Sequence, residues 1–190
     1  MQATVSLLDA RHSKIVKDLW AELNDRFGVR GIYVTPFPHM SYHVADSYDL
    51  QSFQPALAAI AADAHPIQIH TSGLGVFTGG RPILYVPVVR SPELTELHRR
   101  ILSVASAAAI EPSPHYTSEH WSPHITLGYG DLAPHRLAQV LEAFGGRDFT
   151  WDVTLDNLSI IDENGGHQAL KLQLPLGAPA SAEQLVRRSR

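Results

Sequence analysis

The sequence predicts a mixed chain of helices and strands folded as two similar lobes related by a pseudo-twofold axis. Strand-like and helix-like patterns alternate along the chain, and their order repeats after roughly 80 residues. Each repeat also contains one strand in which a histidine and a hydroxyl residue share a side. Two equivalent strands of this kind, brought face to face, would form a paired site.

The first half of the chain has clear helix and strand signals. Asp9 is a candidate helix N-cap, Gly28 ends the helix that follows, and Pro66 closes a later Ala-rich helix. The elements expected here are a strand over 3–8, a helix over 13–27, the first histidine strand over 39–45, a helix over 50–64 and a strand over 67–77.

The second half repeats this order. Ser91 and Pro92 are typical of a helix N-cap followed by proline in the first turn. Glycine-rich turns over 78–81 and 163–166 indicate two hairpins. The elements expected here are a strand over 82–89, a helix from about 93, the second histidine strand from 124, a helix over 134–144 and strands over 149–161 and 169–174.

Matching elements begin at corresponding places in the two halves. The paired start positions are 3 and 82, 13 and 93, 39 and 124, 50 and 134, and 67 and 149. Alternating elements of any α/β protein can align loosely with themselves, but the matched histidines favour a true repeat. We therefore expect a single domain over 1–176, with lobes over about 3–77 and 82–174, and a loose C-terminal tail over 177–190.

Composition restricts the classes of protein that fit. The 190 residues, 44% of them hydrophobic, are enough for one good core or two small lobes. Apolar runs such as 83–89 are too short to span a bilayer, and the first residues do not resemble a signal peptide, so cytoplasm is the default location. A net charge of −4 argues against extended coating of nucleic acid, but it is compatible with a small phosphorylated nucleotide or an RNA terminus.

The two histidine strands share one pattern. Pro38-His39-Met40-Ser41 and Pro123-His124-Ile125-Thr126 each place an imidazole and a hydroxyl on the same face of a strand, roughly 7 Å apart. Across a twofold cleft, two hydroxyls would donate hydrogen bonds to a phosphate, and two imidazoles would flank its phosphorus. One imidazole can take a proton from water while the other gives one to the leaving oxygen, and this chemistry requires no metal.

Other histidines and aromatic residues are alternatives or additions to this site. A third copy, Pro114-His115-Tyr116-Thr117, does not continue into an apolar strand, which favours His124 over His115 as the second catalytic residue. His43 shares the predicted face of His39 and is a candidate for lining the cleft, although the two are too far apart to share a metal. Tyr85 and Trp121 are candidates for stacking on a base, with core packing as the alternative for both.

The paired motifs resemble those of the 2H phosphoesterase superfamily, which includes the bacterial RNA 2′,3′-cyclic phosphodiesterases of the "2′-5′ RNA ligase" family. The second motif matches fully, whereas the first has Ser41 where threonine is commoner. The resemblance implies a bilobal α+β fold with antiparallel sheets around a central cleft and helices outside. It also implies that His39 and His124 are the acid/base pair and that Ser41 and Thr126 bind phosphate. The two-histidine chemistry itself calls for no cofactor.

The resemblance implies cyclic phosphodiesterase activity on 2′,3′-cyclic nucleotides, RNA ends or ADP-ribose cyclic phosphate. Two other classes stay open. A nucleotide-binding or regulatory module would keep the phosphate cage but have no turnover. A histidine–metal hydrolase would contain metal after purification.

Overall fold

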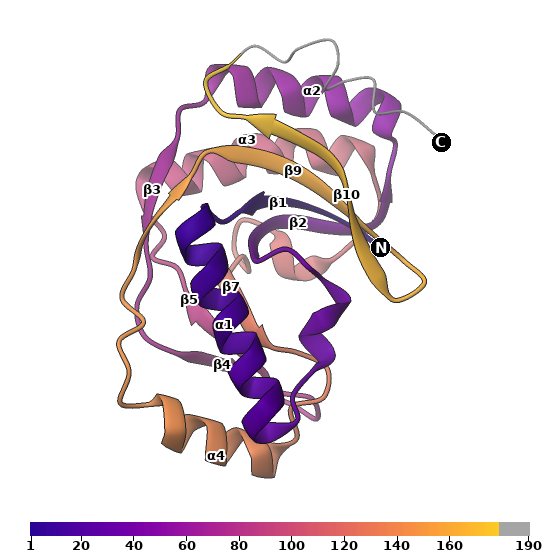
Figure 1. Ribbon diagram of the computed structural model, residues 1–190. Coiled ribbons are helices and arrows are strands. Elements are labelled where there is room, and N and C mark those ends of the chain that lie inside the picture. The colour runs from indigo at the N-terminus through magenta and orange to yellow at the C-terminus, as the bar shows by residue number, and fades with distance from the viewer. Residues whose placement is uncertain (179–190) are drawn as a thin grey trace.

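The computed structural model describes residues 1–178 (Figure 1). Of the tail predicted over 177–190, all but the first two residues lie outside the described residues. No helix of the described part is long and apolar enough to cross a membrane.

Helices and strands alternate along the chain as predicted. The helices are α1 (Ala10–Phe27), α2 (Leu50–Asp63), α3 (Pro92–Ala108) and α4 (Pro134–Phe144), with the short 3-10 helices η1 (Gly31–Val34) and η2 (Pro114–Tyr116). The strands are β1 (Gln2–Leu7), β2 (His39–Tyr48), β3 (Ile67–His70), β4 (Gly75–Phe77), β5 (Ile83–Pro87), β6 (Ala109–Pro112), β7 (His124–Gly128), β8 (Asp152–Leu155), β9 (Asn157–Asn164) and β10 (His167–Pro175).

The residues predicted to cap the helices do so in the structure. The Asp9 carboxylate accepts a hydrogen bond from the backbone N–H of His12 at 2.9 Å, and Gly28 ends α1 with a φ of 66°, which glycine adopts without strain. The Ser91 hydroxyl accepts from the backbone N–H of Leu94 at 3.1 Å and so caps α3. These local contacts fix where α1 begins and ends and where α3 begins.

One large antiparallel sheet organises the fold. Its strand order is β10-β9-β1-β2-β7-β5-β4, with β6 paired to β2, and β3 and β8 form a separate two-stranded sheet. The continuous strands predicted over 67–77 and 149–161 are each divided, because β3 and β8 pair with each other while β4 and β9 join the large sheet. The predicted α+β class with antiparallel strands is confirmed.

Strands of the two predicted repeats are interleaved within this sheet. Strand β9, from the second predicted repeat, lies beside β1, and β4, from the first predicted repeat, lies beside β5. With β10 and β6 set aside, the order is symmetric about the central β2–β7 pair, which contains both histidine motifs. Neither 3–77 nor 82–174 therefore forms one half of the sheet alone, and the superposition of the two ranges stays a prediction.

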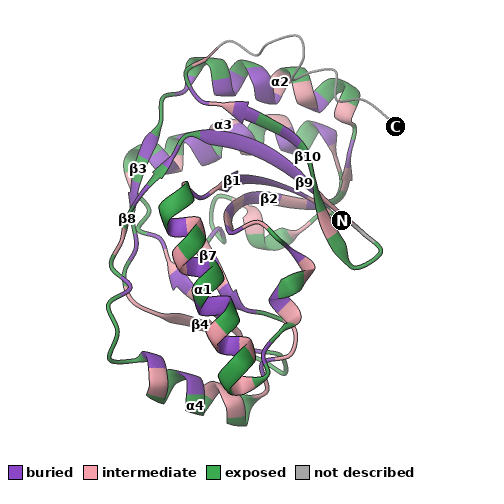
Figure 2. Ribbon diagram, viewed as in Figure 1, coloured by how far each residue is buried: buried purple, intermediate pink, exposed green. Residues whose placement is uncertain are grey.

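The helices divide between the two halves of the sheet. Helices α2 and α3 pack on each other and on the half that contains β2, β9 and β10, whereas α1 contacts β7 and α4 (Figure 1). Strands β1 and β9 are largely buried, and the outer sides of α1, α2 and α4 are exposed (Figure 2). One continuous apolar core joins both halves, and Met40, Ile125 and Leu127 point into it from the two histidine strands.

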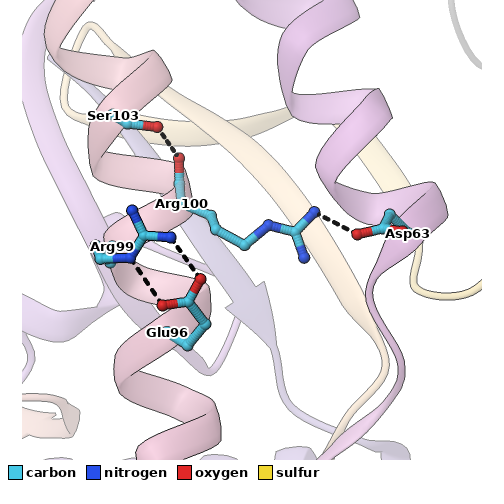
Figure 3. A network of polar contacts seen from close by, with 5 residues as sticks. All are labelled: Asp63, Glu96, Arg99, Arg100 and Ser103. Atoms are coloured by element: carbon cyan, nitrogen blue, oxygen red, sulfur yellow. Dashed lines mark hydrogen bonds and ion pairs between the residues drawn. The ribbon is translucent and has the colours of Figure 1, made fainter.

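Polar contacts at the outer edge link α2 to α3 (Figure 3). Arg100 donates to Asp63 at 2.8 Å, and Arg99 donates to Glu96 within α3 at 2.6 and 2.7 Å. These ion pairs are largely exposed, so each contributes little to stability. The packing of α2 on α3 depends mainly on the core beneath them.

Candidate active site

Strands β2 and β7 place the two motifs side by side at the centre of the sheet. They are antiparallel and pair through Met40 and Ile125, whose side chains are fully buried in the core. Because side chains alternate along a strand, the residues on either side of this pair point to the opposite face. His39, Ser41, His124 and Thr126 therefore share one face, and the register sets each histidine beside the hydroxyl residue of the other strand.

These four residues line one cavity of about 470 Å³. The volume lies within the range of small-molecule sites. The 3-10 helix η1 packs closely against the end of β7 at one side of the cavity, because a Cβ on Gly31 would lie only 2.0 Å from the carbonyl oxygen of Tyr129. This close approach requires glycine at position 31 and brings the η1 segment against the cleft.

Both histidines are oriented in the same way by the backbone. His39 Nδ1 lies 2.6 Å from the carbonyl oxygen of Phe37, and His124 Nδ1 lies 2.7 Å from that of Ser122. A carbonyl only accepts, so each Nδ1 must carry the hydrogen. Each Nε2 is consequently the nitrogen left to exchange a proton with a bound molecule.

Burial lowers the pKa of both imidazoles below the ordinary value of 6.5. For His39, desolvation has the largest effect, the hydrogen bond to Phe37 opposes it, and the positive charge of a protonated His124 lowers the pKa further. For His124, desolvation again dominates and the carbonyl of Ser122 opposes it. Because each charge disfavours the other, states with one neutral and one protonated imidazole are favoured over the doubly charged state.

Two tryptophans donate hydrogen bonds to the backbone carbonyls of the two hydroxyl residues. The indole N–H of Trp121 donates to the carbonyl oxygen of Ser41 at 2.9 Å, and that of Trp20, on α1, donates to the carbonyl oxygen of Thr126 at 3.1 Å. Each motif is thus fixed at its hydroxyl residue by one indole and at its histidine by one carbonyl. The two halves of the site repeat the same support.

His43 does not line the cavity, and this corrects the expectation from strand alternation. β2 contains a bulge at Tyr42, since Ser41 pairs with Val5 while His43 pairs with the adjacent Thr4. The extra residue turns His43 to the core side, where it is 2% exposed and its Nδ1 lies 2.7 Å from the Tyr48 hydroxyl. Burial, together with the nearby His98, lowers the pKa of His43 to about 4.

Neither of the two predicted aromatic candidates is among the residues that line the cavity, although Tyr85 is the cross-strand neighbour of Thr126 and shares its face of the sheet. Trp121 is 2% exposed and stacks on His98 with ring centroids 3.9 Å apart, so core packing is the alternative that the structure supports. Tyr85 stacks on Phe77 at 4.1 Å and contacts the His124 ring at 5.1 Å. Phe77, which the sequence analysis did not single out, is the ring of this pair that lines the cavity.

The third copy of the motif also reaches the cavity. His115 and His120 line it from the η2 segment, together with Tyr116, whose hydroxyl lies beside the Ser41 side chain. No strand pattern indicated this placement, because the segment consists of a 3-10 helix and turns. The pairing of β2 with β7 still supports the prediction that His124 is the catalytic partner of His39.

Comparison with known families agrees with the motifs and the fold. Residues 9–167 match the family model described as the 2′-5′ RNA ligase superfamily. The chain belongs to this superfamily. The match spans most of the chain, including both histidine strands, and it confirms the resemblance to 2H phosphoesterases.

Curated relatives have names of the same class. A protein of Bacillus cereus (strain B4264) named "Putative phosphoesterase" is 27% identical over 158 residues, which cover 80% of this chain and 86% of that protein. A Bacillus thuringiensis (strain Al Hakam) protein of the same name is 26% identical over 161 residues, with the same coverage.

Solved structures share the fold at low sequence identity. TT0787 of Thermus thermophilus has a TM-score of 0.65 and 13% identity, with 94% of this chain and 99% of that chain covered. Escherichia coli LigT complexed with 3′-AMP has a TM-score of 0.57 and 14% identity, with 92% and 97% covered. The fold of this chain is thus shared with these solved structures.

Proposed function

We propose that this superfamily member is a metal-independent phosphoesterase that hydrolyses a cyclic phosphodiester. The observation that carries the proposal is the arrangement of His39 and His124, which line one cavity beside Ser41 and Thr126 with each Nδ1 held by a backbone carbonyl. The candidate substrates are a 2′,3′-cyclic nucleotide, an RNA end that carries one, and ADP-ribose cyclic phosphate. The 3′-AMP bound to LigT supports a nucleotide as the ligand.

In the proposed mechanism, the hydroxyls of Ser41 and Thr126 donate hydrogen bonds to the non-bridging phosphate oxygens. The neutral imidazole accepts a proton at Nε2 from a water that attacks phosphorus. The protonated imidazole gives its Nε2 proton to the leaving ribose oxygen as the phosphorus–oxygen bond breaks. The product is a phosphomonoester, and the two imidazoles have exchanged protonation states, so a proton must return through solvent before the next turnover. Which ribose oxygen leaves decides which histidine is the acid.

The lowered pKa values predict where activity lies on the pH scale. The kcat/KM profile reports the free protein and should be bell-shaped, with one limb for each imidazole. Both pKa values lie below 6.5, so kcat/KM should already fall as pH rises above 6.5, because the acid loses its proton. It should fall again at lower pH, where the base becomes protonated. A kcat/KM that instead rises between pH 6.5 and 8.5 would contradict this assignment.

Metal removal provides the test of the metal-independent mechanism. Purified protein treated with chelator should hydrolyse 2′,3′-cyclic nucleotides at an essentially unchanged rate, because positioned donors and two imidazoles replace a Lewis acid. The four cyclic nucleotides and ADP-ribose cyclic phosphate form the substrate panel. Loss of activity that zinc or manganese restores would favour the histidine–metal hydrolase instead.

A further inference from the structure

The cleft continues beyond the phosphate cage over an apolar floor. After the bulge at Tyr42, Val44 returns to the cavity face of β2, and Ala3 of β1 and Ile161 of β9 lie beside it in register. These three residues line the cavity and form a small apolar cluster that is separate from the main core. A row of aliphatic side chains thus extends across three strands, in the direction away from His124.

The floor ends at two side chains with hydrogen-bond acceptors. Glu163 follows Ile161 by two residues, so it shares the same face of β9, and it pairs with Gln168 of β10; both residues line the cavity. The Oε1 atom of Gln168 is enclosed, and it has no hydrogen-bond partner among residues 1–178. Enclosed polar atoms are nearly always paired, so an unpaired acceptor on a residue that lines the cavity indicates a place for a donor of a ligand.

The distance between the phosphate cage and the acceptors of Glu163 and Gln168 suits one nucleoside. Ser41 is level with Ser159 of β9 through Val5 of β1, and Glu163 lies four residues further along β9. Two strand spacings across the sheet, about 10 Å, and about 13 Å along β9 place the backbones at Ser41 and Glu163 about 16 Å apart. The phosphate and the side chains at both ends occupy part of this span, and the remainder leaves room for one sugar and one base. An apolar floor suits the flat face of a base, and a carboxylate beside an amide oxygen suits its N–H groups.

We propose that Glu163 and Gln168 form a base-binding subsite that selects amino-bearing nucleobases, guanine above all. Guanine offers a ring N–H and an amino group side by side, which a carboxylate and an amide oxygen can both accept. Adenine and cytosine offer an amino group beside an acceptor, and uracil has no amino group. The inference rests on the proposed nucleotide phosphoesterase function, since it assigns base binding to the part of the cleft that lies away from the reacting phosphate.

Equilibrium binding tests the subsite without requiring turnover. By calorimetry, guanosine 3′-monophosphate should bind about 10-fold more tightly than uridine 3′-monophosphate, with the adenosine and cytidine compounds between them. Glu163→Gln and Gln168→Ala should each remove most of this preference by weakening the guanosine compound while leaving the uridine compound within about twofold. The matched controls are Gln173→Ala, an exposed glutamine on the same strand as Gln168, and Glu142→Gln on α4.

Two results would overturn the subsite. One is equal binding of the guanosine and uridine compounds by the unaltered protein, and the other is an equal loss for both compounds in the Glu163 and Gln168 variants. Absence of hydrolysis with the guanosine preference intact would reject the proposed function but keep the subsite. Hydrolysis of all four cyclic nucleotides at equal kcat/KM, with equal binding, would keep the function and reject the subsite.

Discussion

Replacing either His39 or His124 with alanine is expected to lower turnover by about 100- to 10,000-fold, the range usual for a positioned acid or base. Both imidazoles line the same cavity and are oriented alike, so each loss removes one of the two proton transfers. The double variant should be little worse than the poorer single variant, because groups that act as a unit are not additive. Ser41→Ala and Thr126→Ala should cost less and should also weaken phosphate binding.

His115→Ala is the control for this experiment, because His115 belongs to the third copy of the motif and lines the same cavity. It should retain most of the turnover. If His115→Ala abolished hydrolysis while His124→Ala retained it, the pairing of His39 with His124 would be wrong. Circular dichroism of each variant would separate loss of chemistry from loss of fold.

Trp121→Ala is expected to lower the free energy of unfolding by about 3–5 kcal/mol, the usual cost of removing a large buried ring. The ring is 2% exposed, stacks on His98 and also supports the Ser41 strand through its N–H group. Trp121→Phe keeps an aromatic ring but leaves the Ser41 carbonyl without its donor, which should cost about 1–3 kcal/mol. Urea unfolding of the two variants separates packing from the hydrogen bond.

Both Trp121 variants should also lower kcat/KM, because the Ser41 strand loses the contact that fixes its position. Trp151→Phe is the matched control, since this half-buried tryptophan does not line the cavity. It should leave kcat/KM unchanged. A Trp121→Phe variant as stable and as active as Trp151→Phe would show that the indole hydrogen bond has no supporting role.

Local patterns predicted the cage residues correctly as a group on one face. His39 with Ser41, and His124 with Thr126, could be placed together because a strand has a period of two residues. The same rule failed for His43, because the bulge at Tyr42 depends on how β2 pairs with β1, and that pairing is not visible in β2 alone. Trp121 was ambiguous for a related reason, since its partners His98 and Ser41 lie far from it in the sequence.

Local sequence patterns also could not predict that strands of the two predicted repeats would be interleaved in one sheet. The order of elements indicated two equivalent units, but which strands become neighbours depends on contacts between distant segments, such as β1 with β9. Gln168 illustrates the consequence for function. In the sequence it is a polar residue beside a hairpin turn, and only the pairing of β10 with β9 places it in the cavity.

Phosphorus NMR of a 2′,3′-cyclic nucleotide incubated with chelator-treated protein tests the central claim most directly. The unaltered protein should convert the cyclic phosphate resonance into that of a phosphomonoester, and the His39→Ala/His124→Ala variant prepared in parallel should leave it unchanged. Nucleotide binding by the unaltered protein without any conversion across the substrate panel would contradict the claim and identify a binding module. Equal conversion by both proteins would contradict the assignment of the two histidines.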